Sequence, residues 1–131
     1  MSAWLPYLAV GLGSGLGSAL RYWVSLGMLA ALGSYFPWGT LLVNVLGSCL
    51  IGWLATLGAH YAQGHLVRLQ PLLVAGFCGG FTTFSLFSLE TLHLFQEDHF
   101  ALAFLYVATS VPLWLAAALC GQRIAKKQIQ A

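Results

Sequence analysis

The sequence predicts an all-α membrane protein with four transmembrane helices, the third of which is broken near its middle. Of the 131 residues, 60% are hydrophobic and 6% are charged, whereas ordinary chains carry about 25% charged residues. The mean hydropathy is +0.84, and four apolar segments approach or exceed the ~20 residues that a helix needs to cross a bilayer. We therefore expect one four-helix membrane domain over residues 1–131, without a separate soluble domain.

The first half of the chain holds two of the expected spans. One covers residues 4–31 and carries Arg21 in its second half. A turn-forming linker with Gly33 and Pro37 leads to a second span over residues 38–59. No basic segment precedes the first apolar run, so we expect no cleavable signal peptide.

The second half holds the other two spans, over residues 71–95 and 100–121. A polar connection precedes the third span, and the pair Gly79-Gly80 is expected to interrupt it. A tight polar turn separates the third and fourth spans, and a basic tail follows the fourth. The three cysteines are widely spaced in apolar sequence, which favours buried free thiols over a disulfide framework or a CxxC metal site.

Glycines in the first span predict close packing between helices. Gly11 and Gly15 are four residues apart, as are Gly13 and Gly17. Such small-xxx-small pairs let membrane helices approach closely. A dinucleotide-binding fingerprint is not indicated, because the spacing differs and no strand precedes these glycines.

The clearest functional signal is the segment 76–90, GFCGGFTTFSLFSLE. Glycines interrupt a membrane helix there, and hydroxyl side chains and phenylalanines follow. Backbone released from helical hydrogen bonding at membrane depth is tolerated only where protein buries it or where it lines a polar cavity. The segment therefore indicates either a conduction or binding site or a kink whose small residues serve helix packing.

Polar side chains also recur on the second span. Thr40, Asn44 and Ser48 are spaced by four residues and share one helix face. The amide of Asn44 supplies two N–H donors near the membrane interior. Either a helix–helix hydrogen bond or a binding role accounts for it.

Aromatic residues form a stripe on the third span, where Phe81, Phe84, Phe87 and Glu90 recur every three residues. Such a stripe commonly packs a core. The alternative is a pore lining, because the positive edge of an aromatic ring attracts an anion weakly and conduction needs sites that an ion can leave. Glu90 lies about two turns beyond Phe84, near a mouth rather than the pore centre.

Tyr106 and Ser110 extend the hydroxyl pattern to the fourth span, where they are four residues apart. Arg21 is either a cation in an aqueous vestibule or a snorkelling helix-end residue. The donors at membrane depth are thus mostly neutral, and acids are nearly absent. This pattern indicates a small anion, and four short helices leave so little room that we expect the pathway to form between two copies.

At these residues the sequence resembles the Fluc (CrcB) family of fluoride channels. The matching motifs are GSGLGSALRY at residues 13–22, GTLLVN at 39–44 with Gly47, and GFCGGFTTFSLFSLE at 76–90. The similarity in length, span count and motif order covers nearly the whole chain.

The resemblance implies an antiparallel, dual-topology homodimer with two fluoride pores in the bacterial plasma (inner) membrane. Fluoride would leave the cytoplasm passively, which confers fluoride resistance. The resemblance also implies a structural sodium ion (Na+) on the dimer axis, bound by the backbone carbonyls of Gly79 and Thr82. The implied fluoride pathway comprises Asn44, Phe84, Ser85, Phe87, Tyr106 and Ser110, with Arg21 in the vestibule and Glu90 near the mouth.

Two positions depart from the family pattern. Leu86 stands where the family commonly has threonine, which removes one hydroxyl from the expected polar track. Pro112 follows Ser110 by two residues, and we expect it to perturb the fourth helix and shift Ser110.

Other classes of protein fit less well. A small multidrug-resistance-type transporter also has four spans, but its proton coupling needs an acid deep in the first helix, where this chain has Arg21. No nucleophile–base pair, metal constellation or nucleotide motif predicts an enzyme. Basic residues favour the side that holds both termini, so the positive-inside rule predicts cytoplasmic termini, in tension with the dual topology that the resemblance implies.

Overall fold

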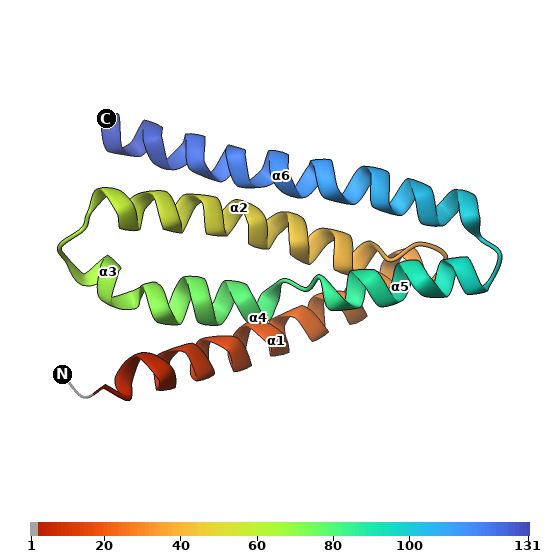
Figure 1. Cartoon of the computed structure of the whole chain (residues 1–131), viewed down its shortest axis with the longest axis horizontal. Helices are drawn as coiled ribbons and strands as arrows, with labels where there is room; N and C mark the ends of the chain where they lie inside the picture. Colours follow the sequence, from red (N-terminus) through yellow and green to blue (C-terminus); the bar gives the residue numbers. More distant parts are fainter. Residues whose placement is uncertain (1–2) are drawn as a thin grey trace.

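The computed structural model describes residues 3–131, and over that range its regular elements are all helices, as predicted. Four helical rods pack against one another (Figure 1). Three are α1 (Leu5–Leu32), α2 (Trp38–His60) and α6 (Phe100–Gln130), and the remaining rod joins α3 (His65–Gln70), η1 (Pro71–Cys78), α4 (Gly79–Phe81) and α5 (Ser85–Gln96). Met1 and Ser2, which belong to the expected domain, lie outside the described residues.

Three of the rods are long and apolar enough to cross a membrane, namely Trp38–His60, His65–Gln96 and Phe100–Gln130. α1 contains 28 residues, about 42 Å at 1.5 Å per residue, but its glycines and Arg21 lower its hydropathy. Length and hydropathy therefore agree for three of the four expected spans, and the first meets the length criterion alone.

The rods differ from the expected spans mainly at their ends. The third rod is already helical at His65, and its hydrogen-bond spacing changes from α to π at Pro71, whose ring removes one N–H donor. α6 continues to Gln130 because Ala125 is buried and Gln128 accepts a hydrogen bond from a tryptophan of α2. Pro112 lies inside α6 without ending it, so the expected perturbation is too small to break the helix.

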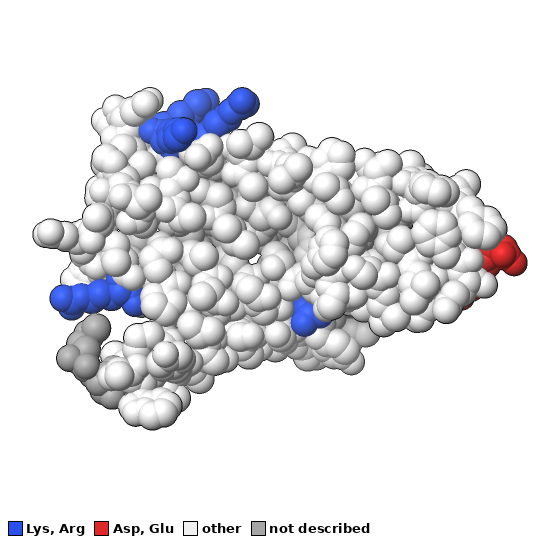
Figure 2. Space-filling view, viewed as in Figure 1, with Lys and Arg blue, Asp and Glu red and all other residues white. Residues whose placement is uncertain are grey.

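Charge separates the two ends of the bundle. The start of α1 and the end of α6 lie at the same end (Figure 1), where Figure 2 shows most of the basic side chains, while acidic side chains mark the opposite end. The basic end carries Arg68 of α3 and the α6 residues Arg123, Lys126 and Lys127, and the turn before α6 carries Glu97 and Asp98.

Close packing of α1 on the third rod requires glycine at several positions. A methyl group at Gly13 or Gly17 would overlap backbone atoms of η1, and one at Gly80 would overlap the backbone of Ser14. The predicted packing role is therefore confirmed for Gly13 and Gly17. Gly11 and Gly15, by contrast, have no atom within 4 Å of an added Cβ.

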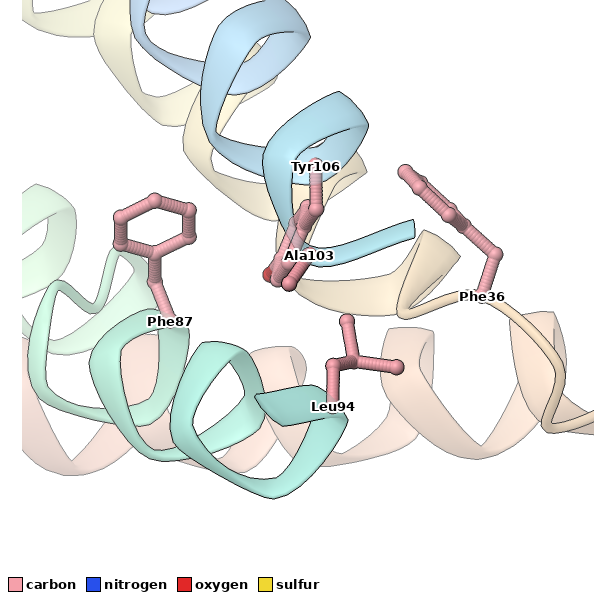
Figure 3. Close-up of a cluster of buried hydrophobic side chains, with 5 residues drawn as sticks. All are labelled: Phe36, Phe87, Leu94, Ala103 and Tyr106. Atoms are coloured by element: carbon pink, nitrogen blue, oxygen red, sulfur yellow. The ribbon is translucent and has the colours of Figure 1, made fainter. Parts of the chain in front are cut away.

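The core between α5 and α6 is aromatic at its centre. Figure 3 shows Phe87 and Leu94 from α5 facing Ala103 and Tyr106 from α6, with Phe36 from the linker before α2 closing the cluster. Tyr106 is fully buried and makes edge contacts with both phenylalanines. This cluster fixes the start of α6 against the segment that follows the helix break.

Candidate functional site

The third rod is broken at residues 82–84, between α4 and α5 (Figure 1). Thr82 is extended, with φ of −88° and ψ of 159°. Gly79 keeps helical angles of −61° and −41°, so the break lies three residues beyond the expected Gly79-Gly80 position. Gly80 serves packing instead, since it lies directly against α1.

Asn44 bridges the two backbone polar groups of Thr83 at the break. Its Nδ2 donates to the Thr83 carbonyl at 2.8 Å, and its Oδ1 accepts from the Thr83 N–H at 2.7 Å. Asn44 is 5% exposed, so these bonds satisfy backbone groups that water reaches poorly. The second N–H of the amide takes no part in these two hydrogen bonds.

The backbone carbonyls of residues 79–82 lose their helical donors at the break. In a continuous helix the Thr83 N–H would donate to Gly79, but it donates to Asn44. The Leu86 N–H would donate to Thr82, but it donates to the Thr83 hydroxyl at 3.1 Å. The carbonyls of Gly79 and Thr82, the pair expected to bind sodium, are among those released in this way.

Arg21 of α1 lies against the same segment. Its Nε donates to the Gly80 carbonyl at 3.1 Å, and the Ser18 hydroxyl donates to that carbonyl at 3.3 Å. The Gly80 carbonyl is therefore occupied, in contrast to its neighbours. Arg21 is half-buried and places a cationic group beside the break.

The two phenylalanines expected in the pathway have different surroundings. Phe84 is 68% exposed and Phe87 is 5% exposed, although their ring centroids are 5.4 Å apart. Phe87 is in edge contact with Tyr106 at 4.9 Å and with Trp114 at 4.7 Å. The pair thus connects an outer face of the subunit with its interior.

A cavity of about 180 Å³ adjoins the break. Its lining combines hydroxyl, amide and aromatic groups from three rods: Asn44, Ser48, Ile51, Thr82, Thr83, Phe84 and Trp114. Sequence reasoning missed Trp114, although it lies four residues after Ser110 and so continues the stripe that begins at Tyr106.

Glu90 is enclosed by hydroxyl donors. Thr40 donates to its Oε1 at 2.8 Å and Tyr106 donates to its Oε2 at 2.7 Å. Glu90 lines a larger cavity of about 370 Å³, which also contacts the linker before α2. A position of Glu90 near a pore mouth stays a prediction.

The remaining expected residues lie in different environments. Ser85 is exposed, with its hydroxyl 3.3 Å from that of Thr83. Ser110 is fully buried, and its Oγ has no hydrogen-bond partner in the described chain. The departure at Pro112 has therefore not exposed Ser110.

Side-chain metal ligands do not cluster in the part of the chain that the structure describes. Residues 3–131 contain no group of three or more His, Cys, Asp or Glu that could hold a metal ion. Cys49, Cys78 and Cys120 are free thiols, as expected, but Cys78 alone is buried. A cation at the break would therefore use backbone, hydroxyl or amide oxygens.

The broken membrane helix, with its adjoining cavity and its asparagine bridge, defines a helical membrane protein of the channel and transporter class. The chain belongs to the CrcB family, described as CrcB-like protein, Camphor Resistance (CrcB), whose pattern matches residues 8–122. This membership confirms the predicted family and sets aside the multidrug-resistance-type alternative.

Curated relatives from several bacteria share nearly the full chain. The Fluoride-specific ion channel FluC of Rhizobium johnstonii is 46% identical over 114 residues, 87% of this chain and 90% of the relative. The protein of the same name from Nitrobacter winogradskyi is 44% identical over 124 residues, 94% and 97% of the two chains. That of Paramagnetospirillum magneticum is 44% identical over 118 residues, 89% and 92%. These are ion channels by name, in line with the prediction that the chain is not an enzyme.

Proposed function

We propose that this protein is a fluoride-selective passive ion channel that lets fluoride leave the bacterial cytoplasm across the plasma membrane. The observation that carries the proposal is the Asn44 bridge at the helix break, which opens the backbone and leaves one amide N–H free beside the adjoining cavity. The names of the relatives supply the identity of the ion.

The lining of the cavity suits a small anion. It offers neutral donors and ring edges, and the nearby acid Glu90 has both carboxylate oxygens paired with hydroxyl donors. Neutral donors replace part of the hydration shell of an ion without binding it so strongly that it stays. Fluoride would pass the positions Arg21, Asn44, Phe84, Ser85, Phe87, Glu90, Tyr106 and Ser110.

We propose an antiparallel homodimer with two pores as the working assembly. Phe84 and Gly79 are exposed on the single chain, and lipid would cover the released backbone groups poorly. A second copy related by a two-fold axis in the membrane plane would cover this face and place equivalent residues symmetrically. In this assembly α1, with its 28 residues, is the fourth spanning helix.

We also propose that a sodium ion on the dimer axis joins the two subunits. The carbonyls of Gly79 and Thr82 lack their helical donors for the reasons given above, and hard cations prefer oxygen ligands. Two subunits would bring four such oxygens together. The role of the ion would be structural, holding the two broken helices in register.

The function is tested by fluoride efflux from proteoliposomes. Purified protein should release fluoride from loaded vesicles without a proton gradient, and it should pass little chloride. A fluoride flux equal to that of empty vesicles, or equal fluxes of the two anions, would refute the proposal. A cationic dye as a second cargo separates this activity from that of a drug transporter.

The orientation is tested by labelling a cysteine placed at the exposed Gln130, in a variant that lacks Cys49, Cys78 and Cys120. The basic end of the bundle (Figure 2) favours cytoplasmic termini by the positive-inside rule, whereas the proposed dimer requires both orientations. An impermeant reagent should label about half of the protein in intact cells. Labelling confined to cells that have been opened would mean one orientation and no antiparallel dimer.

A further inference from the structure

Two polar atoms in the core of the subunit are buried without a partner in the described chain: Ser110 Oγ and Trp114 Nε1. Neighbouring deep polar groups are paired, since Asn44 bridges Thr83 and Tyr106 donates to an acid. Buried polar side chains in native proteins nearly always have a partner, and an exception points to an unseen water or ion. Two such exceptions lie one helical turn apart.

Both side chains belong to one face of α6. Ser110 and Trp114 are four residues apart, so they point to the same side of the helix. Phe87 makes edge contacts with Tyr106 before this pair and with Trp114 at its end. Trp114 also lines the 180 Å³ cavity that contains Asn44. Trp114 therefore lies next to both the phenylalanine and the cavity of the proposed pathway, and Ser110 lies one helical turn before it.

The chemistry of the pair determines what it can bind. An indole N–H is a donor and cannot accept, and a serine hydroxyl rotates to donate where an acceptor is present. A ligand to which both side chains donate accepts two hydrogen bonds in a small space. A dehydrated fluoride ion does so, and the positive edges of nearby aromatic rings add a weak attraction for an anion.

We propose that the Ser110 hydroxyl and the Trp114 indole N–H together form a fluoride-binding position beside Phe87. Trp114 acts there as a specificity-determining donor in the pathway. The inference rests on the proposed function, because fluoride has to enter the pathway to reach this position. It adds Trp114, which neither the motifs nor the family resemblance assigned, to Ser110, which the resemblance already implied.

Nuclear magnetic resonance of the tryptophan indoles tests the position directly. In 15N-labelled protein reconstituted in nanodiscs, sodium fluoride should shift the indole N–H resonance of Trp114 downfield in a saturable manner, and sodium chloride should not. The indole of Trp53 donates to Gln128 at 2.7 Å in an exposed site, so its resonance should stay in place. The resonance of Trp114 is identified as the one that disappears in the Trp114→Phe variant. If that variant does not fold, the Trp114→Tyr variant serves the same purpose.

Fluoride efflux from proteoliposomes provides a second test of the proposed position. Trp114→Phe keeps a ring against Phe87 but removes the N–H, and it should lower fluoride efflux about tenfold, the effect of losing one hydrogen bond to a charged ligand. Trp53→Phe removes a paired indole N–H and should leave the flux unchanged. Ser110→Ala should weaken the fluoride dependence of the Trp114 shift.

The outcomes separate this inference from the proposed function. A Trp114 resonance indifferent to fluoride would mean that water or packing accounts for the site. If fluoride shifts the Trp114 resonance but the Trp114→Phe variant conducts at the wild-type rate, Trp114 does not contribute to conduction. Either result overturns the inference while wild-type fluoride flux still supports the channel. Absence of wild-type flux in the same vesicles would instead refute the proposed function.

Discussion

Asn44 bonds both backbone groups of Thr83, accepting from its N–H at 2.7 Å and donating to its carbonyl at 2.8 Å. These two bonds replace the helical partners that Thr83 loses where the third rod breaks. One of the two amide hydrogens remains unused. A single side chain therefore both holds the break open and offers a donor to the adjoining cavity.

Replacing Asn44 by aspartate should block conduction. Asn44→Asp keeps an acceptor for the Thr83 N–H but removes both amide donors and sets a carboxylate oxygen against the Thr83 carbonyl. A lost hydrogen bond to a charged ligand costs about 1.5–3 kcal/mol, so fluoride efflux should fall at least ~10-fold. Gln63→Glu makes the same chemical change in the connection after α2 and should conduct normally. Normal efflux by Asn44→Asp would reduce Asn44 to a packing residue.

The two phenylalanines should respond alike in flux and differently in stability. Phe84→Ile and Phe87→Ile retain apolar bulk but lose the ring edge, so both should abolish most fluoride efflux. Phe87 is buried between Tyr106 and Trp114, and its truncation should also cost about 1–3 kcal/mol of unfolding free energy. Because Phe84 is exposed, Phe84→Ile should lower the unfolding free energy of the subunit by less than ~0.5 kcal/mol.

Efflux assays and thermal unfolding of the reconstituted variants check both expectations. Phe104→Ile supplies a matched control, since that ring is 66% exposed on α6 and lines neither cavity. Folded phenylalanine variants that conduct at the wild-type rate would show that the rings only pack the core.

Contact between α1 and α4 should tolerate no methyl group at Gly80. An added Cβ would overlap the backbone of Ser14, which no side-chain rotation relieves. Overpacking of this kind costs about 1–3 kcal/mol, so Gly80→Ala should lower the unfolding temperature in detergent. Gly15→Ala, whose added Cβ meets no atom within 4 Å, should leave it unchanged in the monomer. Equal unfolding temperatures for the two variants would contradict the observed packing.

Sodium should stabilise the assembly if the released carbonyls of Gly79 and Thr82 bind it. Exchanging sodium for potassium or lithium at constant ionic strength should lower fluoride efflux and the resistance of the dimer to dissociation. The readouts are efflux and the monomer–dimer equilibrium in detergent or lipid. Indifference of both to the cation would eliminate the proposed sodium site.

Much of the site could be predicted from the sequence because membrane burial leaves polar residues few explanations. Thr40 and Asn44 share a face and both bond the third rod, as their spacing suggested. The position of the break was less accessible, because glycine composition pointed to Gly79-Gly80. The break depends on a tertiary partner, Asn44, that competes for the Thr83 N–H.

Other features lay outside the reach of sequence patterns for similar reasons. The hydroxyl of Ser110 is buried without a partner among residues 3–131, and the indole N–H of Trp114 shares this property, yet neither motif nor spacing reports hydrogen-bond satisfaction. The helical extension to Gln130 follows from packing on α2 beyond the apolar run. Tertiary contacts, rather than local propensity, decide each of these features.

Current recording in a planar bilayer with unequal fluoride on the two sides tests the central claim most directly. A passive fluoride channel predicts a current that reverses at the fluoride equilibrium potential and stays there when the chloride or proton gradient is changed. A reversal potential that follows chloride or protons, or the absence of current where fluoride exchange is measured, would contradict fluoride-selective passive conduction.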